Sequence, residues 1–92
     1  MKTYNDLSDD QLVQLAGLAV DDPDREWVVD RTRGGYISLR SGTAEVFFWP
    51  EDGDIFPEVH TGDRTRPYTL NHFWQIVALC RSWGVDYSPK AS

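Results

Sequence analysis

The chain has 92 residues, 40% of them hydrophobic and 13% aromatic, which is the composition of a globular protein rather than a disordered one. The net charge is −6, and Cys80 is the one cysteine, so a disulfide within the chain is excluded and a reducing compartment is indicated. The opening residues lack the apolar core of a secretory signal, and no apolar run reaches the ~18–20 residues of a membrane span. We therefore expect a cytoplasmic protein with a single domain over residues 1–92.

A first helix is predicted after residues 1–7, which we expect to be a short lead-in. Ser8 and Gln11 have the spacing of a capping box, and acidic residues follow Ser8 in the first turn, where the helix dipole favours anions. The segment of residues 21–24, which contains a proline, is expected to end this helix in a loop. The inward-facing positions are Leu12, Leu15, Ala16 and Ala19.

A second helix is predicted from Thr69, a candidate N-cap, to Gly84, a candidate left-handed residue at the C-terminal end. At about 100° per residue, its apolar side chains fall on one wide face, with Leu70 at the edge. Each large side chain buried there contributes roughly 1.5–3 kcal/mol. The members of this face are Phe73, Ile76, Val77, Cys80 and Trp83. Because Cys80 lies on this face, we expect a packed thiol rather than a nucleophile.

Three antiparallel strands are predicted between the helices. The strand-forming runs span residues 26–33, 36–40 and 43–49, with turn signals at Gly34-Gly35 and Ser41-Gly42. A short further edge strand within residues 54–60 is an alternative, although Pro57 limits its pairing. The expected fold class is therefore α+β in the order α-β-β-β-α, a three-stranded antiparallel meander with two helices packed on one face.

The pairing of these strands decides which side chains face the core. If Ser41-Gly42 is a two-residue loop, Leu39 lies opposite Ala44 and Ile37 opposite Val46, and Phe48 continues the same apolar side. The first hairpin is ambiguous, because a two-residue loop directs Asp30 to the core and a three-residue loop directs Val29 there. We favour Val29.

The opposite side of the sheet is predicted to be a partner-binding surface. Aromatic side chains beside an arginine are typical of interface hot spots. The expected members are Tyr36, Arg40, Phe47 and Trp49. The alternative is that residues 50–68 fold back and cover this side.

The acidic charge is concentrated in two segments. Residues 1–30 contain eight acidic and two basic residues, and residues 51–58 contain four acidic residues and no basic one. Binding to nucleic acid depends on neutralising phosphates, so we expect no direct nucleic-acid contact, no membrane contact and a protein partner with a basic surface. The alternative is that the charge only provides solubility. The expected acidic contacts are Asp21, Asp22, Asp24, Glu51, Asp52 and Asp54.

Catalytic and metal sites are weakly indicated. His60, Asp63 and His72 are candidate metal ligands, but their spacing matches no established pattern, so we predict no metal, no cofactor and no catalytic residue. One alternative is a small metal-dependent enzyme or accessory protein using His60, Asp63 and Arg64. Another is a structural or assembly protein that self-associates through its aromatic face, so both a monomer and a homodimer remain open.

The whole chain resembles small acidic phage-encoded proteins of the anti-defence inhibitor kind. The features that carry the resemblance are the 92-residue length, the lone Cys80, the opening YNDLSDDQL and the acidic patches on an α-β-β-β-α order. The resemblance implies a non-enzymatic inhibitor, such as an anti-CRISPR protein, that acts in the host cytosol. Its acidic patches would mimic nucleic acid and block a basic nucleic-acid-binding surface of a host complex.

Overall fold

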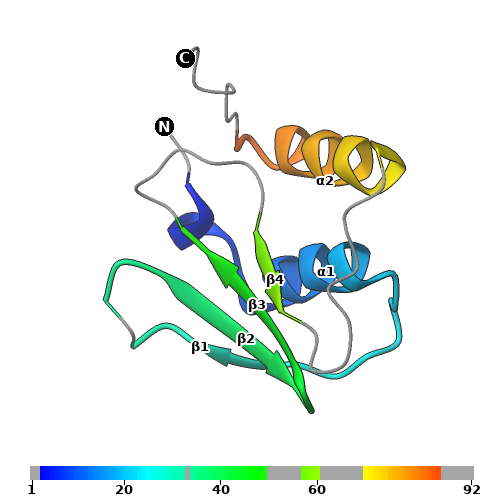
Figure 1. The fold of residues 1–92 in the computed structure, drawn as a ribbon. Helices are drawn as coiled ribbons and strands as arrows, with labels where there is room; N and C mark the ends of the chain where they lie inside the picture. The colour runs from blue at the N-terminus through cyan, green and yellow to red at the C-terminus, as the bar shows by residue number, and fades with distance from the viewer. Residues whose placement is uncertain (1–2, 33, 50–56, 61–69, 86–92) are drawn as a thin grey trace.

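A computed structural model describes residues 3–32, 34–49, 57–60 and 70–85 (Figure 1). The fold is α+β, with two helices and a four-stranded antiparallel meander in the strand order β1-β2-β3-β4. The elements in chain order are the 3₁₀ turn η1 (Tyr4–Asp6), α1 (Asp9–Val20), β1 (Val28–Asp30), β2 (Ile37–Ser41), β3 (Ala44–Phe48), β4 (Glu58–His60) and α2 (Leu70–Ser82). No helix in the described part of the chain is long and apolar enough to cross a membrane.

The expectation of three strands is wrong, because β4 adds a fourth at the edge beside β3. It lies within residues 54–60, where an edge strand was the alternative, and it pairs Val59 with Val46 and Glu58 with Phe47. Pro57 immediately precedes β4, so its missing N–H is kept out of the ladder. The pairing also brings Val59 against the core, which gives this short strand an apolar anchor.

The N-terminal end of α1 confirms the predicted capping box. The Gln11 N–H donates to Ser8 Oγ at 3.2 Å, and the Ser8 N–H donates to Gln11 Oε1 at 2.8 Å. The predicted inward stripe is buried along its whole length. Two backbone donors that the helix leaves free are therefore satisfied at the point where its apolar face begins.

The C-terminal end of α1 folds back tightly on itself. The Asp22 N–H donates to the Gly17 carbonyl at 2.9 Å and the Asp21 N–H donates to the Leu18 carbonyl at 3.2 Å, as in a Schellman motif. Asp21 takes the left-handed conformation, with φ of 58°. A Cβ on Gly17 would lie 3.3 Å from both the Asp22 oxygen and the Pro23 Cα, so the absent side chain gives this turn its room.

The same motif ends α2, with the residue predicted for it. Gly84 has φ of 84°, and its N–H donates to the Arg81 carbonyl at 3.0 Å. The Val85 N–H donates to the Cys80 carbonyl at 2.9 Å, and both side chains are fully buried. The candidate N-cap Thr69 and the side chains of Leu70 and Phe73 lie outside the described residues.

The predicted core face is confirmed, but the predicted pairing of the β2–β3 hairpin is wrong by two residues. Ser41 lies opposite Ala44 and Leu39 opposite Val46, so the two-residue loop is Gly42-Thr43. Gly42 has φ of 61°, and a glycine with positive φ at the first loop position is the requirement of a type II′ turn. A shift of two residues leaves every side chain on its predicted face.

The first hairpin places Val29 on the core side, as favoured. Val29 lies opposite Leu39 and Asp30 opposite Ser38. The connection is longer than either loop considered, because β1 ends at Asp30 and β2 begins at Ile37. Asp30 Oδ1 accepts from the Thr32 N–H at 2.9 Å, which turns the chain away from the ladder at once.

One buried cluster joins the inner face of the sheet to both helices and to the N-terminal turn. Its members are Tyr4, Leu7, Leu12, Leu15, Ala16, Ala19, Ile37, Leu39, Val46, Phe48, Ile76, Val77, Cys80 and Val85. The expectation that residues 1–7 are only a lead-in is therefore wrong for Tyr4 and Leu7. Tyr4 is fully buried and meets the Phe48 ring edge-on at 4.8 Å between centroids.

Replacing Tyr4 tests whether the N-terminal turn is part of the core. Tyr4→Ala should lower the free energy of unfolding by about 3–5 kcal/mol, because it removes a buried aromatic side chain and leaves a cavity. Chemical denaturation measures the loss, and exposed Asn5→Ala is the control, with a change within about 0.5 kcal/mol. Equal stability of the two variants would contradict a structural role for Tyr4.

Replacing Asp21 tests the strain at the end of α1. Asp21→Gly should raise the free energy of unfolding by about 0.5–1 kcal/mol, because glycine adopts positive φ without a Cβ penalty. It also removes a negative charge from the negative end of the helix dipole. Thermal and chemical denaturation measure the gain, and Asp21→Asn, which changes mainly the charge, should give a smaller one. A destabilised glycine variant would contradict the assignment.

Candidate protein-binding surface

The outer face of the sheet carries the predicted aromatic contacts. Strand alternation directs to it the side chains of Val28, Asp30, Tyr36, Ser38, Arg40, Glu45, Phe47, Trp49, Glu58 and His60, since their neighbours in sequence pack inward. The core cluster that includes both helices lies on the opposite face (Figure 1). The structure thus brings Tyr36, Arg40, Phe47 and Trp49 together on one surface, as the sequence predicted.

Four rings on this face form a continuous aromatic row, from Trp49 through Tyr36 and Phe47 to His60. The Trp49 and Tyr36 rings lie 4.7 Å apart with an interplanar angle of 33°. Tyr36 meets Phe47 edge-on at 5.5 Å, and Phe47 meets His60 edge-on at 5.4 Å. Such contacts fix the orientation of rings on the face away from the described helices, because edge-to-face and offset pairs are the favoured aromatic geometries.

Glu58 connects the two ends of the aromatic row. Trp49 Nε1 donates to Glu58 Oε2 at 3.3 Å, and His60 Nε2 lies 3.1 Å from Glu58 Oε1. The sequence-based prediction did not include Glu58 and His60 in this surface. Their alternation along β4 could have indicated them, but only once β4 was known to pair with β3.

The other half of the outer face is a shallow depression beside the row. Val28, Asp30, Ser38 and Arg40 line a cavity of about 260 Å³. Ser38 is 4% exposed at its floor, whereas Val28 is 72% exposed at its rim. Arg40 Nη2 lies 3.6 Å from Glu45 Oε1, so the positive charge on this face has an acidic neighbour.

The acidic contacts predicted after α1 lie away from the aromatic row. Asp22 Oδ2 lies 3.3 Å from Arg25 Nε, and Arg25 donates to the Ser41 carbonyl at 3.3 Å. Ser41 ends β2 and Tyr36 precedes it, so this loop and the Trp49–Tyr36 end of the row are separated by roughly 17 Å along the strand. Asp21 lies 3.5 Å from His72 and Asp24 is exposed. The other three predicted contacts, Glu51, Asp52 and Asp54, lie outside the described residues.

The described residues do not form the ligand cluster that the metal-site alternative requires. No group of three His, Cys, Asp or Glu side chains that could hold a metal is found there. His60 lies beside Glu58, and His72 lies beside Asp21. Asp63 and Arg64, the remaining residues of the enzymatic alternative, are outside the described part of the chain.

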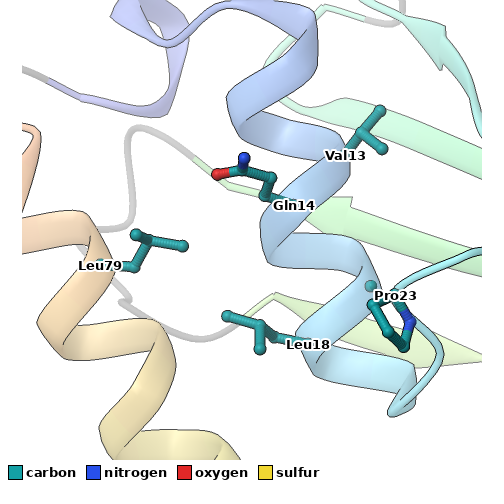
Figure 2. Close-up of a pocket in the computed structure, with 6 residues that line it drawn as sticks. Val13, Gln14, Leu18, Pro23 and Leu79 are labelled. Carbon is teal, nitrogen blue, oxygen red and sulfur yellow. The ribbon is translucent and has the colours of Figure 1, made fainter.

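A second depression lies between the helices, and the sequence did not indicate it. Val13, Gln14, Gly17, Leu18, Pro23 and Leu79 line a largely apolar cavity of about 260 Å³. Figure 2 shows Gln14 and Leu18 pointing from α1 toward Leu79 of α2. Gly17 contributes no side chain here, so the small residue that permits the turn after α1 also leaves this space open.

Comparisons with protein-family models, with curated proteins and with solved structures found no match to this chain.

Cys80 packs in the core, which confirms the expectation of a buried thiol. It is fully buried, and burial raises its pKa from 9.0 to about 11, while a side-chain hydrogen bond with Tyr4 acts in the opposite direction. A thiol in this environment is poor in thiolate at neutral pH, and the thiolate is the nucleophilic form.

Burial of Cys80 predicts both slow alkylation and a loss of stability in alkali. The Cys80 thiol ionises more readily in the unfolded chain than in the folded one. The free energy of unfolding should therefore fall as the pH rises from about 9 to 11. Unfolding free energies measured across that range should decline more steeply for the natural chain than for Cys80→Ala. Alkylation by iodoacetamide at neutral pH should be much faster in denaturant. Equal rates in the native and denatured chains would contradict the placement.

Proposed function

We propose that this chain is a non-enzymatic protein-binding module and that the outer face of the sheet is its binding surface. The observation that supports the proposal is the aromatic row, an ordered set of half-exposed rings on the face opposite the helix-packed core. Aromatic residues and arginine are enriched in the energetically dominant part of protein interfaces. Arg40 lies on the same face, and exposed Val28 extends its apolar surface.

The partner that fits this module has a basic surface. Among the described residues of the outer face, Asp30, Glu45 and Glu58 outnumber the one arginine, and the whole chain carries −6. Complementary charge accelerates association and discriminates against acidic partners such as nucleic acid. In the specific form of this proposal, the module is a phage-encoded inhibitor, such as an anti-CRISPR protein, that covers a basic nucleic-acid-binding surface of a host complex.

The acidic loop after α1 contributes to this mechanism mainly through long-range attraction. Asp22 already has a cationic neighbour in Arg25, so its charge is partly compensated, and Asp21 lies 3.5 Å from His72. Asp24 is exposed and is the stronger candidate for direct contact. Glu51, Asp52 and Asp54 complete the proposed acidic contacts.

Site-specific photocrosslinking tests which face binds. A photoreactive residue at position 40, on the outer face, should form an adduct with one protein in a lysate of the native cells. The matched control is position 78, an exposed alanine on α2, away from the outer face. The position-40 adduct should diminish with added salt, because exposed charges are screened within about 10 Å at 0.1 M ionic strength.

The same experiment can overturn the proposal. Adducts that form equally at positions 40 and 78, or only at position 78, would place the binding surface elsewhere. An adduct at position 40 with a second copy of the chain alone would favour the self-associating alternative, and light scattering would then show a dimer.

A further inference from the structure

The carboxylate of Glu58 is held in place and still open to a ligand. Oε2 accepts from Trp49 Nε1 at 3.3 Å, and Oε1 lies 3.1 Å from His60 Nε2. The side chain nevertheless remains 52% exposed. An ionised carboxylate offers about four lone-pair sites over its two oxygens, so these two contacts leave acceptor capacity on both.

An aromatic surface adjoins this carboxylate directly. Trp49, which donates to Glu58, is tilted against Tyr36 with 4.7 Å between ring centroids, and both rings are partly exposed. An aromatic face attracts a cation within about 6 Å of its centroid, and tryptophan does so most strongly. A carboxylate beside an indole therefore offers two kinds of attraction to one positive group.

We propose that the outer face binds an arginine side chain of the protein partner, with its guanidinium stacked on the Trp49–Tyr36 pair and hydrogen-bonded to Glu58. This rests on the proposed function and deepens it by naming the partner residue that is recognised. Guanidinium is planar, stacks on rings and donates in a rigid fork that matches a carboxylate, whereas the lysine ammonium is a compact, strongly hydrated charge.

The surrounding charges favour a cation at this position. Glu45 lies 3.6 Å from Arg40 and offsets its charge, while Asp30 adds a further carboxylate on the same face. An anionic ligand would be repelled by these carboxylates on the described part of the outer face. The complementary ligand is therefore a planar cation that can stack on a ring and donate to a carboxylate. The guanidinium of arginine has these properties.

Titration with model peptides tests this site on the full chain. The probe is a capped peptide of alternating glycine and arginine, and its matched controls replace arginine by citrulline, which is neutral and similar in shape, or by lysine. NMR should show the Trp49 indole N–H signal shifting with the arginine peptide. Affinity for the citrulline peptide should be at least about fivefold weaker, because charge-assisted hydrogen bonds are roughly twice as strong as neutral ones.

Two glutamate variants separate a specific site from general attraction. Glu58→Gln and Glu45→Gln remove the same charge from the same face, and in the first variant the amide oxygen can still accept from the Trp49 indole. Glu58→Gln should weaken arginine-peptide binding at least about fivefold, whereas Glu45→Gln should change it less than about twofold. Unchanged backbone spectra establish that both variants are folded.

Several outcomes would overturn the arginine site. They are absence of binding by the arginine peptide, equal binding of the citrulline or the lysine peptide, equal effects of the two glutamate variants, and shifts confined to residues 21–24. A position-40 adduct together with any of these would retain the binding face and reject arginine as its ligand. An adduct confined to position 78 would instead reject the proposed function, whatever the peptides do.

Discussion

Packing of the inner sheet face against both helices is the interaction on which the rest of the structure depends. Leu39, Val46 and Phe48 are completely buried there, and Tyr4 closes the same cluster against Phe48. A small domain has one such core and cannot supply a second layer of helices. Among the described residues of the outer face, the aromatic row is held by ring-on-ring contact and by the hydrogen bond from Trp49 to Glu58.

Those parts of the fold that depend on local patterns could be predicted from the sequence. Alternation placed Ile37, Leu39 and Val46 inward, and the capping pair marked the start of α1. The register of strand pairing is harder to predict from the sequence. A shift of two residues leaves each side chain on the same face of the sheet, so the hydrophobic pattern does not distinguish the two registers. The two possible loops, Ser41-Gly42 and Gly42-Thr43, place Gly42 at the second or the first loop position. The positive φ of Gly42 fits the first position of a type II′ turn, so the turn type decides the register.

The features that were missed depend on contacts distant in sequence. Tyr4 stands alone in a polar segment and has no apolar periodicity, so nothing local distinguishes it from an exposed residue. The capping box between Thr3 and Asp6 shapes the turn, but the burial of Tyr4 depends on its contact with Phe48, which is distant in sequence. The strand β4 is three residues long, so the sequence indicated it only as an alternative, and its pairing with β3 establishes it. Short elements of this kind are stabilised by tertiary contacts rather than by their own propensity.

In the candidate site, too, the residues set by local patterns could be predicted, and those set by distant contacts could not. The four residues predicted for it share a face because strand alternation is local, whereas Glu58 and His60 join them only through β4. A count of acidic residues also overstates the free charge, since Asp22 has an internal partner in Arg25. Sequence therefore indicated the composition of the surface better than its electrostatics.

The aromatic row and the acidic segments act over different distances. In the proposed function, the net charge of −6 would attract a basic partner from as far as the screening length, but it would not fix an orientation. The row is a short-range feature whose rings are held by one another and by Glu58, so little side-chain freedom remains to be lost on binding. Because Glu58 belongs to β4 and Trp49 follows β3, the shape of this surface depends on the pairing of those two strands. Any change that displaces β4 from the sheet edge would therefore alter the surface proposed for binding and would also remove Val59 from its contact with the core.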